Sequence, residues 1–132
     1  MKFYHSIFLL VIPLFLINCR NHVKKDDRIE QIYPFASSRY FEYKKNDNSS
    51  DTDAFGKLKF SKSTIIVIVN NNIETFTDKC NIKTVTYDDN PNELEYQTDN
   101  GNFVVKFEND TIKEVTLYTR DFLTIFYKTK LK

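Results

Sequence analysis

The 132-residue chain has few of the residues from which most enzyme sites are built. It contains two glycines, two cysteines, two histidines and no tryptophan. Gly56 and Gly101 are too few for a glycine-rich phosphate loop, which excludes the usual nucleotide enzymes. Paired carboxylates such as Glu93 and Glu95 are available, but alternating charge on the wet face of a strand produces the same pattern. The sequence therefore predicts no catalytic residues, no metal ligands and no cofactor.

Long apolar runs are also rare, and one stands at the start of the chain. Met1 and Lys2 lead into an apolar run from Phe8 to Ile17, which contains Pro13. A membrane-spanning helix needs roughly 20 apolar residues, about twice the length of this run. A charged start followed by a short apolar stretch is typical of an export signal. We therefore expect residues 1–18 to be a signal peptide.

The run ends in Leu16-Ile17-Asn18-Cys19, which resembles the lipobox of bacterial lipoprotein precursors. Three of the four positions fit that pattern. The resemblance implies cleavage before Cys19, attachment of diacylglycerol to its thiol, and anchoring of the exported chain in a bacterial membrane. Arg20 after the cysteine would fit release to the outer membrane where two membranes are present. The resemblance covers 19 residues and implies no activity, and ordinary signal cleavage nearby is the alternative.

The charge of the remaining chain is balanced. Residues 1–18 contain one lysine and no acid, which leaves 18 basic and 18 acidic residues. The two signs are interspersed through nearly every segment, whereas nucleic-acid-binding domains usually carry a basic patch or stripe. We expect no nucleic-acid partner and no non-specific attraction to anionic membranes. Attachment to a membrane would come from the lipid on Cys19 alone.

Reactive side chains are scarce after removal of the signal. Cys80 would be the one thiol besides the lipidated Cys19, so an oxidising compartment would form no intrachain disulfide. Its expected role is that of a small buried residue, because solvated lysines nearby do not make a thiol reactive. His22 would be the one histidine that remains. This excludes a nucleophile–histidine–acid triad and a zinc site built from histidine or cysteine.

Two polar stretches precede the main body of the chain. Residues 19–33 are mostly polar or charged, with Ile29, Ile32 and Tyr33 at helical spacing, which predicts a tether that ends in one short helix before Pro34. Residues 44–54 are almost entirely polar and predict a mobile loop.

The acids of that loop match a calcium site poorly. Phe55 and Lys62 stand where a calcium loop that begins at Asp51 requires oxygen ligands. A looser cage of Asp47, Asp51 and Asp53 is the alternative to an ordinary acidic loop.

From Phe55 onward, β-branched and aromatic residues alternate with polar ones between short turns rich in Asn and Asp. With one earlier segment, this pattern predicts strands at 39–44, 55–61, 64–69, 73–77, 82–87, 94–98, 102–108, 111–119 and 122–129. Connections of two to five residues favour antiparallel neighbours. We therefore expect a mainly β fold, an antiparallel meander of about eight or nine short strands in one domain over residues 34–132. A small barrel or half-barrel is favoured over a two-sheet sandwich.

Alternation also predicts which side chains face the core. The expected inward residues are Ile82, Leu94, Tyr96, Phe103, Val105, Phe107, Val115, Leu117, Leu123, Ile125 and Tyr127. The segment 65–69 is apolar at every position, which predicts a central strand covered on both faces by the short helix or the N-terminal segment.

Aromatic residues are abundant and supply the remaining functional hypothesis. Most would fill the core, but tyrosine also suits binding surfaces because it joins a rigid ring to a polar tip. The candidate ligand-facing or partner-facing tyrosines are Tyr40, Tyr43, Tyr87, Tyr96, Tyr118 and Tyr127.

Two functional hypotheses follow from these patterns. The first is a membrane-anchored, non-enzymatic interaction protein of the bacterial envelope, facing the periplasm or the surface. The alternative is a lipocalin-like barrel that carries a small apolar or amphipathic ligand, although the chain has no Gly-x-Trp signature. The large inward side chains favour a filled core and hence the first hypothesis.

Overall fold

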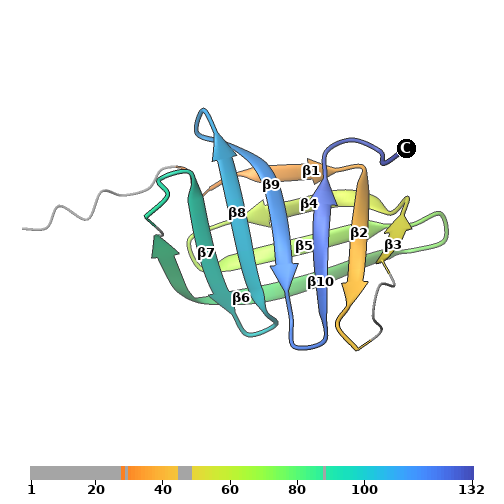
Figure 1. The fold of residues 1–132 in the computed structure, drawn as a ribbon, viewed down its shortest axis with the longest axis horizontal. Helices are drawn as coiled ribbons and strands as arrows, with labels where there is room; N and C mark the ends of the chain where they lie inside the picture. Colours follow the sequence, from red (N-terminus) through yellow and green to blue (C-terminus); the bar gives the residue numbers. More distant parts are fainter. Residues whose placement is uncertain (1–27, 29, 45–48, 88) are drawn as a thin grey trace, which may run out of the picture.

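The computed structural model describes residues 28, 30–44, 49–87 and 89–132. These residues form ten antiparallel strands in one curled sheet, a half-barrel without an α-helix in the described part (Figure 1). The strands are β1 (Ile32–Phe35), β2 (Ser37–Glu42), β3 (Ser49–Thr52), β4 (Phe55–Phe60), β5 (Thr64–Asn70), β6 (Thr75–Tyr87), β7 (Glu93–Thr98), β8 (Asn102–Glu108), β9 (Thr111–Tyr118) and β10 (Phe122–Tyr127). Their order across the sheet is β1-β4-β5-β6-β7-β8-β9-β10-β2-β3. The predicted mainly β, antiparallel half-barrel is confirmed.

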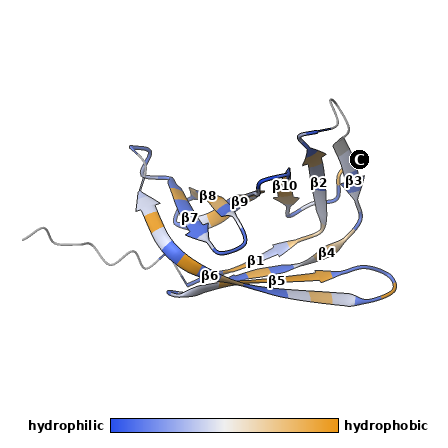
Figure 2. Ribbon diagram, turned by 90° about the horizontal axis from the view of Figure 1, so that it is seen from below, coloured by the Kyte–Doolittle hydropathy of each residue, from blue (hydrophilic) through white to orange (hydrophobic). Residues whose placement is uncertain are grey.

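The sheet forms two layers because β6 belongs to both of them. The first half of β6 pairs with β5 and its second half with β7, and the register shifts between Ile82 and Thr84. The back layer is β1, β4, β5 and the first half of β6, and the front layer is the rest of β6 with β7–β10, β2 and β3. Figure 2 shows the two layers edge-on, with the strands of the back layer below. The two strands predicted at 73–77 and 82–87 are thus one continuous strand.

The core lies between the inner faces of the two layers. Phe35 of β1 meets Phe126 of β10 at a ring-centroid distance of 5.0 Å, and Phe60 of β4 meets Tyr96 of β7 at 5.6 Å. The predicted inward residues that prove buried are Leu94, Tyr96, Phe103, Val105, Phe107 and Val115. Burial of such alternating residues on both layers is what stabilises a sheet that folds over on itself.

Side chains of the N-terminal segment close the seam where the back layer meets the front layer. The Tyr33 hydroxyl donates to the carbonyl oxygen of Phe126 at 2.8 Å and lies 3.3 Å from that of Lys113. The amide of Gln31 bridges the β8–β9 turn, donating to the Asp110 carbonyl at 2.7 Å and accepting from the Ile112 N–H at 3.1 Å. These contacts join the edge strand β1 of the back layer to β9, β10 and the β8–β9 turn of the front layer.

The predicted short helix is wrong where the structure describes it, because residues Ile32–Phe35 form β1. Tyr33 and Phe35 are buried whereas Ile32 and Pro34 are exposed, a period of two that defines a strand. Pro34 is tolerated because β1 is an edge strand, paired only with β4. The rest of the predicted tether, at residues 19–27 and 29, lies outside the described residues.

Part of the predicted loop 44–54 is also a strand, since Ser49–Thr52 form β3 at the other edge of the sheet. Polar side chains hold it against β2. The Ser38 and Thr52 hydroxyls lie 2.9 Å apart, and Arg39 forms two hydrogen bonds to Asp51. A strand held in this way needs no apolar residue, so alternation of hydrophobic residues could not reveal it. Residues 45–48 lie outside the described part.

The predicted inward phase of β10 is wrong. Phe126 is buried and pairs with the buried Val115, which places Leu123, Ile125 and Tyr127 on the opposite, outer face. β10 is apolar in both phases, and the close contact of Phe126 with Phe35 decides which phase faces the core. The prediction of cover on both faces of β5 also fails, because Ile66 and Ile68 stay partly exposed on its outer face.

Candidate functional site

The free thiol of Cys80 lies in the core. It is 2% exposed on β6, with its sulfur 4.0 Å from a carboxylate oxygen of Asp78 and 3.8 Å from the Asn100 amide nitrogen. Burial, reinforced by the negative charge of Asp78, raises the pKa of the thiol to about 11. The thiol is therefore protonated at neutral pH, which is the opposite of what a nucleophile needs.

We expect the Cys80 thiol to resist alkylation in the folded protein. Its rate with a thiol reagent at pH 8 should rise strongly in denaturant, since reaction requires both exposure and ionisation. Mass spectrometry of the peptide that contains Cys80, after timed labelling with and without urea, measures this rate. Rapid labelling of the folded protein would contradict the account.

Carboxylates in the described part of the chain do not gather into a site, and several have ordinary hydrogen-bond partners. No group of three or more His, Cys, Asp or Glu side chains in this part could hold a metal ion. Asp51, a member of the hypothetical calcium cage, is paired with Arg39 at 2.6 Å, and this hydrogen bond lowers its pKa. Glu95, on β7, accepts a hydrogen bond from the Asn102 amide at 3.0 Å.

The six candidate tyrosines do not form one surface. Tyr96 is 1% exposed and belongs to the core, so it cannot face a partner. Tyr40 lies on the inner-face row of β2 with its ring 5.1 Å from that of Phe122, while the exposed Tyr43 follows β2 and the exposed Tyr87 ends β6. Tyr118 and Tyr127 lie on the outer face of β9 and β10.

Those last two tyrosines belong to an apolar surface on the outer face of the front layer. The strand register places its members side by side across β8, β9, β10 and β2. This front patch consists of Phe41, Val104, Tyr118, Leu123, Ile125 and Tyr127, all exposed or partly exposed. Leu123 stands between Tyr118 and Phe41 in one cross-strand row, and Ile125 lies in the next row. The outer face of an antiparallel sheet is normally polar, so this patch is unusual.

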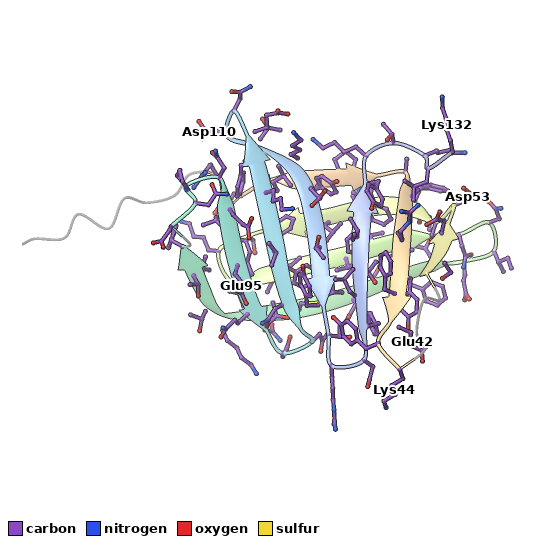
Figure 3. The ribbon with its side chains drawn as sticks, in the orientation of Figure 1. Glu42, Lys44, Asp53, Glu95, Asp110 and Lys132 are labelled. Carbon is purple, nitrogen blue, oxygen red and sulfur yellow. The ribbon has the colours of Figure 1, made fainter. Side chains whose placement is uncertain are left out.

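Charged pairs surround the front patch. Arg39 and Asp51 lie beyond Ile125 on β2 and β3, and Lys106 and Glu114 form a 2.9 Å pair on β8 and β9. The hydrogen bond that Lys106 donates to Glu114 raises the pKa of Lys106. Figure 3 shows Glu95 on β7, to one side of β8–β10. An apolar centre within a charged rim is the usual anatomy of a protein interface.

The sequence indicated this surface only in part. Tyr118 and Tyr127 are among the candidate tyrosines, whereas alternation predicts Leu123 and Ile125 to be core residues and gives no signal for Phe41. The signal that could have revealed it is the six-residue run Phe122–Tyr127, which is apolar in both phases on a strand of a half-open sheet.

Comparisons with known proteins give no information about this surface. No protein-family model, no curated protein and no solved structure matches the chain. Within the described residues, no helix has the length and apolar character required to cross a membrane.

Proposed function

We propose that this chain is an exported, lipid-anchored, non-enzymatic binding protein of the bacterial envelope, and that the front patch binds a protein partner. The observation that carries the proposal is the outer face of β10, where Leu123, Ile125 and Tyr127 remain partly exposed. Apolar and aromatic side chains within a charged rim favour association with another protein, because their removal from water is favourable on contact.

The N-terminus supports the anchored part of the proposal. The lipobox-like Leu16-Ile17-Asn18-Cys19 provides an attachment point for diacylglycerol, and twelve residues separate Cys19 from the first strand at Ile32. Such a segment spans at most ~45 Å when extended. The half-barrel would therefore stay within reach of the bilayer surface while its front patch meets proteins of the same compartment.

The interior favours a partner-binding protein over a carrier of small ligands. A carrier needs a cavity of roughly 300 Å³ or more between its sheet walls. Here the inner faces meet through aromatic contacts, Phe35 with Phe126 and Phe60 with Tyr96. Side chains from both layers thus fill part of the space between the sheet walls, which favours a partner-binding protein.

Replacement of Leu123 and Ile125 by Gln should remove the partner. The change takes two apolar side chains out of the centre of the front patch, and central apolar anchors carry most of the binding energy at interfaces, so recovery should fall by about tenfold or more. The measurement is quantitative mass spectrometry of proteins that co-purify with the tagged full-length chain in mild detergent.

The matched control replaces Ile73, between β5 and β6, and Phe76 of β6 by Gln, a similar loss of exposed apolar surface away from the front patch. Circular dichroism of both variants confirms that the sheet is retained. A partner lost from the front variant and kept by the control supports the proposal. Equal recovery from both variants, or equal loss, would contradict it.

A further inference from the structure

We propose that the outer face of the back layer is a second binding surface, which lies against an anionic lipid bilayer. This surface, the back face, is the side of β1, β4, β5 and the first half of β6 that turns away from the front layer (Figure 2). It goes beyond the proposed protein-binding patch, which is on the opposite side of the molecule.

The strand register brings together lysines that are distant in the sequence. One cross-strand row contains Ile32, Lys59, Ile66 and Lys79, and the next contains Pro34, Lys57, Ile68 and Thr77. The side chains of Lys57 and Lys79 are exposed and that of Lys59 is partly exposed. Within the described residues, these lysines form no ion pair with an acid. The two rows carry three positive charges and no carboxylate.

Charge is thereby segregated between the two sides of a chain whose overall charge is balanced. The outer face of the front layer carries five carboxylates, Glu93, Glu95, Glu108, Glu114 and Asp51, against the three cations Lys106, Lys113 and Arg39. An anionic surface attracts the back face and repels the front face. Electrostatics would therefore orient the protein with its front patch directed away from the bilayer.

Apolar side chains between the lysines suit a bilayer better than a wholly polar anion. Ile32 is 62% exposed at the edge of the back face, and Ile66 and Ile68 are partly exposed beside Lys59 and Lys57. Lysine stems lie along apolar surface while their ammonium groups reach polar headgroups, and isoleucine side chains enter the interface between them.

The position of the tether supports the same occupant, a step that rests on the proposed lipid anchor. The back face begins at Ile32, the first strand residue after the segment that leads from Cys19. The two acyl chains of a diacylglycerol would hold the chain at the bilayer without fixing its orientation, and a basic patch adds the attraction that turns one face toward anionic lipid. Each lysine near an anionic surface adds roughly a fivefold factor to the partition coefficient, so three would add roughly 100-fold.

The orientation is tested by lysine footprinting of the full chain reconstituted in vesicles of phosphatidylcholine, with or without phosphatidylglycerol. A water-soluble amine reagent and peptide mass spectrometry then measure the reactivity of each lysine. We expect Lys57, Lys59 and Lys79 to lose reactivity by roughly threefold or more on the anionic vesicles, whereas Lys106 and Lys113 keep theirs. The protection should disappear in 1 M salt, where the Debye length falls to about 3 Å.

Variants with the same net charge provide the control. Lys57, Lys59 and Lys79 are replaced by Gln in one chain, and the exposed Lys44, Lys130 and Lys132 in the other. Both also carry Cys19→Ser, so that no acyl chain holds them on the vesicles and flotation reports the contribution of the lysines. The first variant should partition roughly 100-fold less than the control into anionic vesicles.

Several outcomes would overturn the proposal. These are equal flotation of the two variants, equal lysine reactivity on both kinds of vesicle, and protection of the back face without lipid that grows with protein concentration. The last would assign the face to a second copy of the chain. The peptide that contains Cys19 reports acylation in the same digest, so failure of the lipid anchor is seen separately from failure of the back face.

Discussion

Replacement of Tyr33 by Ala should destabilise the half-barrel by about 3–5 kcal/mol, the usual cost of removing a large aromatic side chain from a core. Tyr33 is 1% exposed, and its hydroxyl reaches the Phe126 carbonyl of the opposite layer. The substitution leaves a cavity and also opens the seam that β1 closes. Since small domains have a free energy of unfolding of about 5–15 kcal/mol, urea denaturation should show a large fall in midpoint or loss of the folded state.

The Tyr33→Phe variant separates the hydroxyl from the ring. It keeps the aromatic packing and removes the hydrogen bond to the Phe126 carbonyl, together with the longer contact to that of Lys113, so we expect a smaller loss, about 1–3 kcal/mol. A Tyr33→Phe chain as stable as the wild type would show that the seam does not depend on this contact.

Tyr33 should also make the free energy of unfolding depend on pH between about 10 and 12. Burial, followed by the nearby charge of Glu114, raises its pKa from 10.0 to about 12. Because the unfolded chain ionises first, the stabilisation from the protonated phenol is complete below pH 10 and is lost as the pH rises toward 12. The wild type should therefore lose more stability than Tyr33→Phe over this interval.

Replacement of Gly56 by Ala should disrupt the back layer by roughly 3 kcal/mol or more. A Cβ atom at this position would lie 1.9 Å from the carbonyl oxygen of Ile68 and 3.1 Å from the ring of Phe35. The first contact is with backbone, so β4 and β5 would have to move apart. Urea denaturation of Gly56→Ala measures the loss.

The matched control is Lys57→Ala on the next residue of β4, whose side chain is exposed. A surface substitution of this kind should change the free energy of unfolding by less than about 0.5 kcal/mol. Equal midpoints for the Gly56 and Lys57 variants would show that the close approach of β4 to β5 relaxes without cost.

Much of the sheet could be predicted from the sequence because its local signals agree with the fold. The predicted strand at 102–108 coincides with β8, and Asn109 and Asp110 form a turn with φ values of 51° and 61°. Such positive φ angles favour Asn and Asp in two-residue hairpin loops. Local turn chemistry and alternation thus suffice for hairpins between neighbouring strands.

The strands that were missed depend on distant partners. β1 and β3 have four residues each, and their contacts are with β4 and β2. β6 was divided in two because its polar middle, which includes Asp78 and Lys79, lacks alternation, although pairing with β5 keeps it extended. Short or polar strands gain their stability from tertiary contacts that no local pattern records.

The surfaces could be predicted least, because a face is a property of the register. Alternation cannot decide which phase of Phe122–Tyr127 is buried, and a shift of one residue would exchange the two faces. The balanced charge of the chain likewise gives no indication of the back face, whose three lysines lie up to 22 positions apart in the sequence. Composition indicated no attraction to anionic membranes, whereas the register suggests one.

The central claim is that the two outer faces of the half-barrel meet different partners, and paired photo-crosslinking in bacteria that express the full chain tests it most directly. A photoreactive amino acid is placed at Ile125 of the front patch in one chain and at Ile66 of the back face in another. We predict a discrete protein adduct from Ile125 and lipid adducts from Ile66, each identified by mass spectrometry. The same adducts from both positions, or lipid from Ile125 and protein from Ile66, would contradict the account.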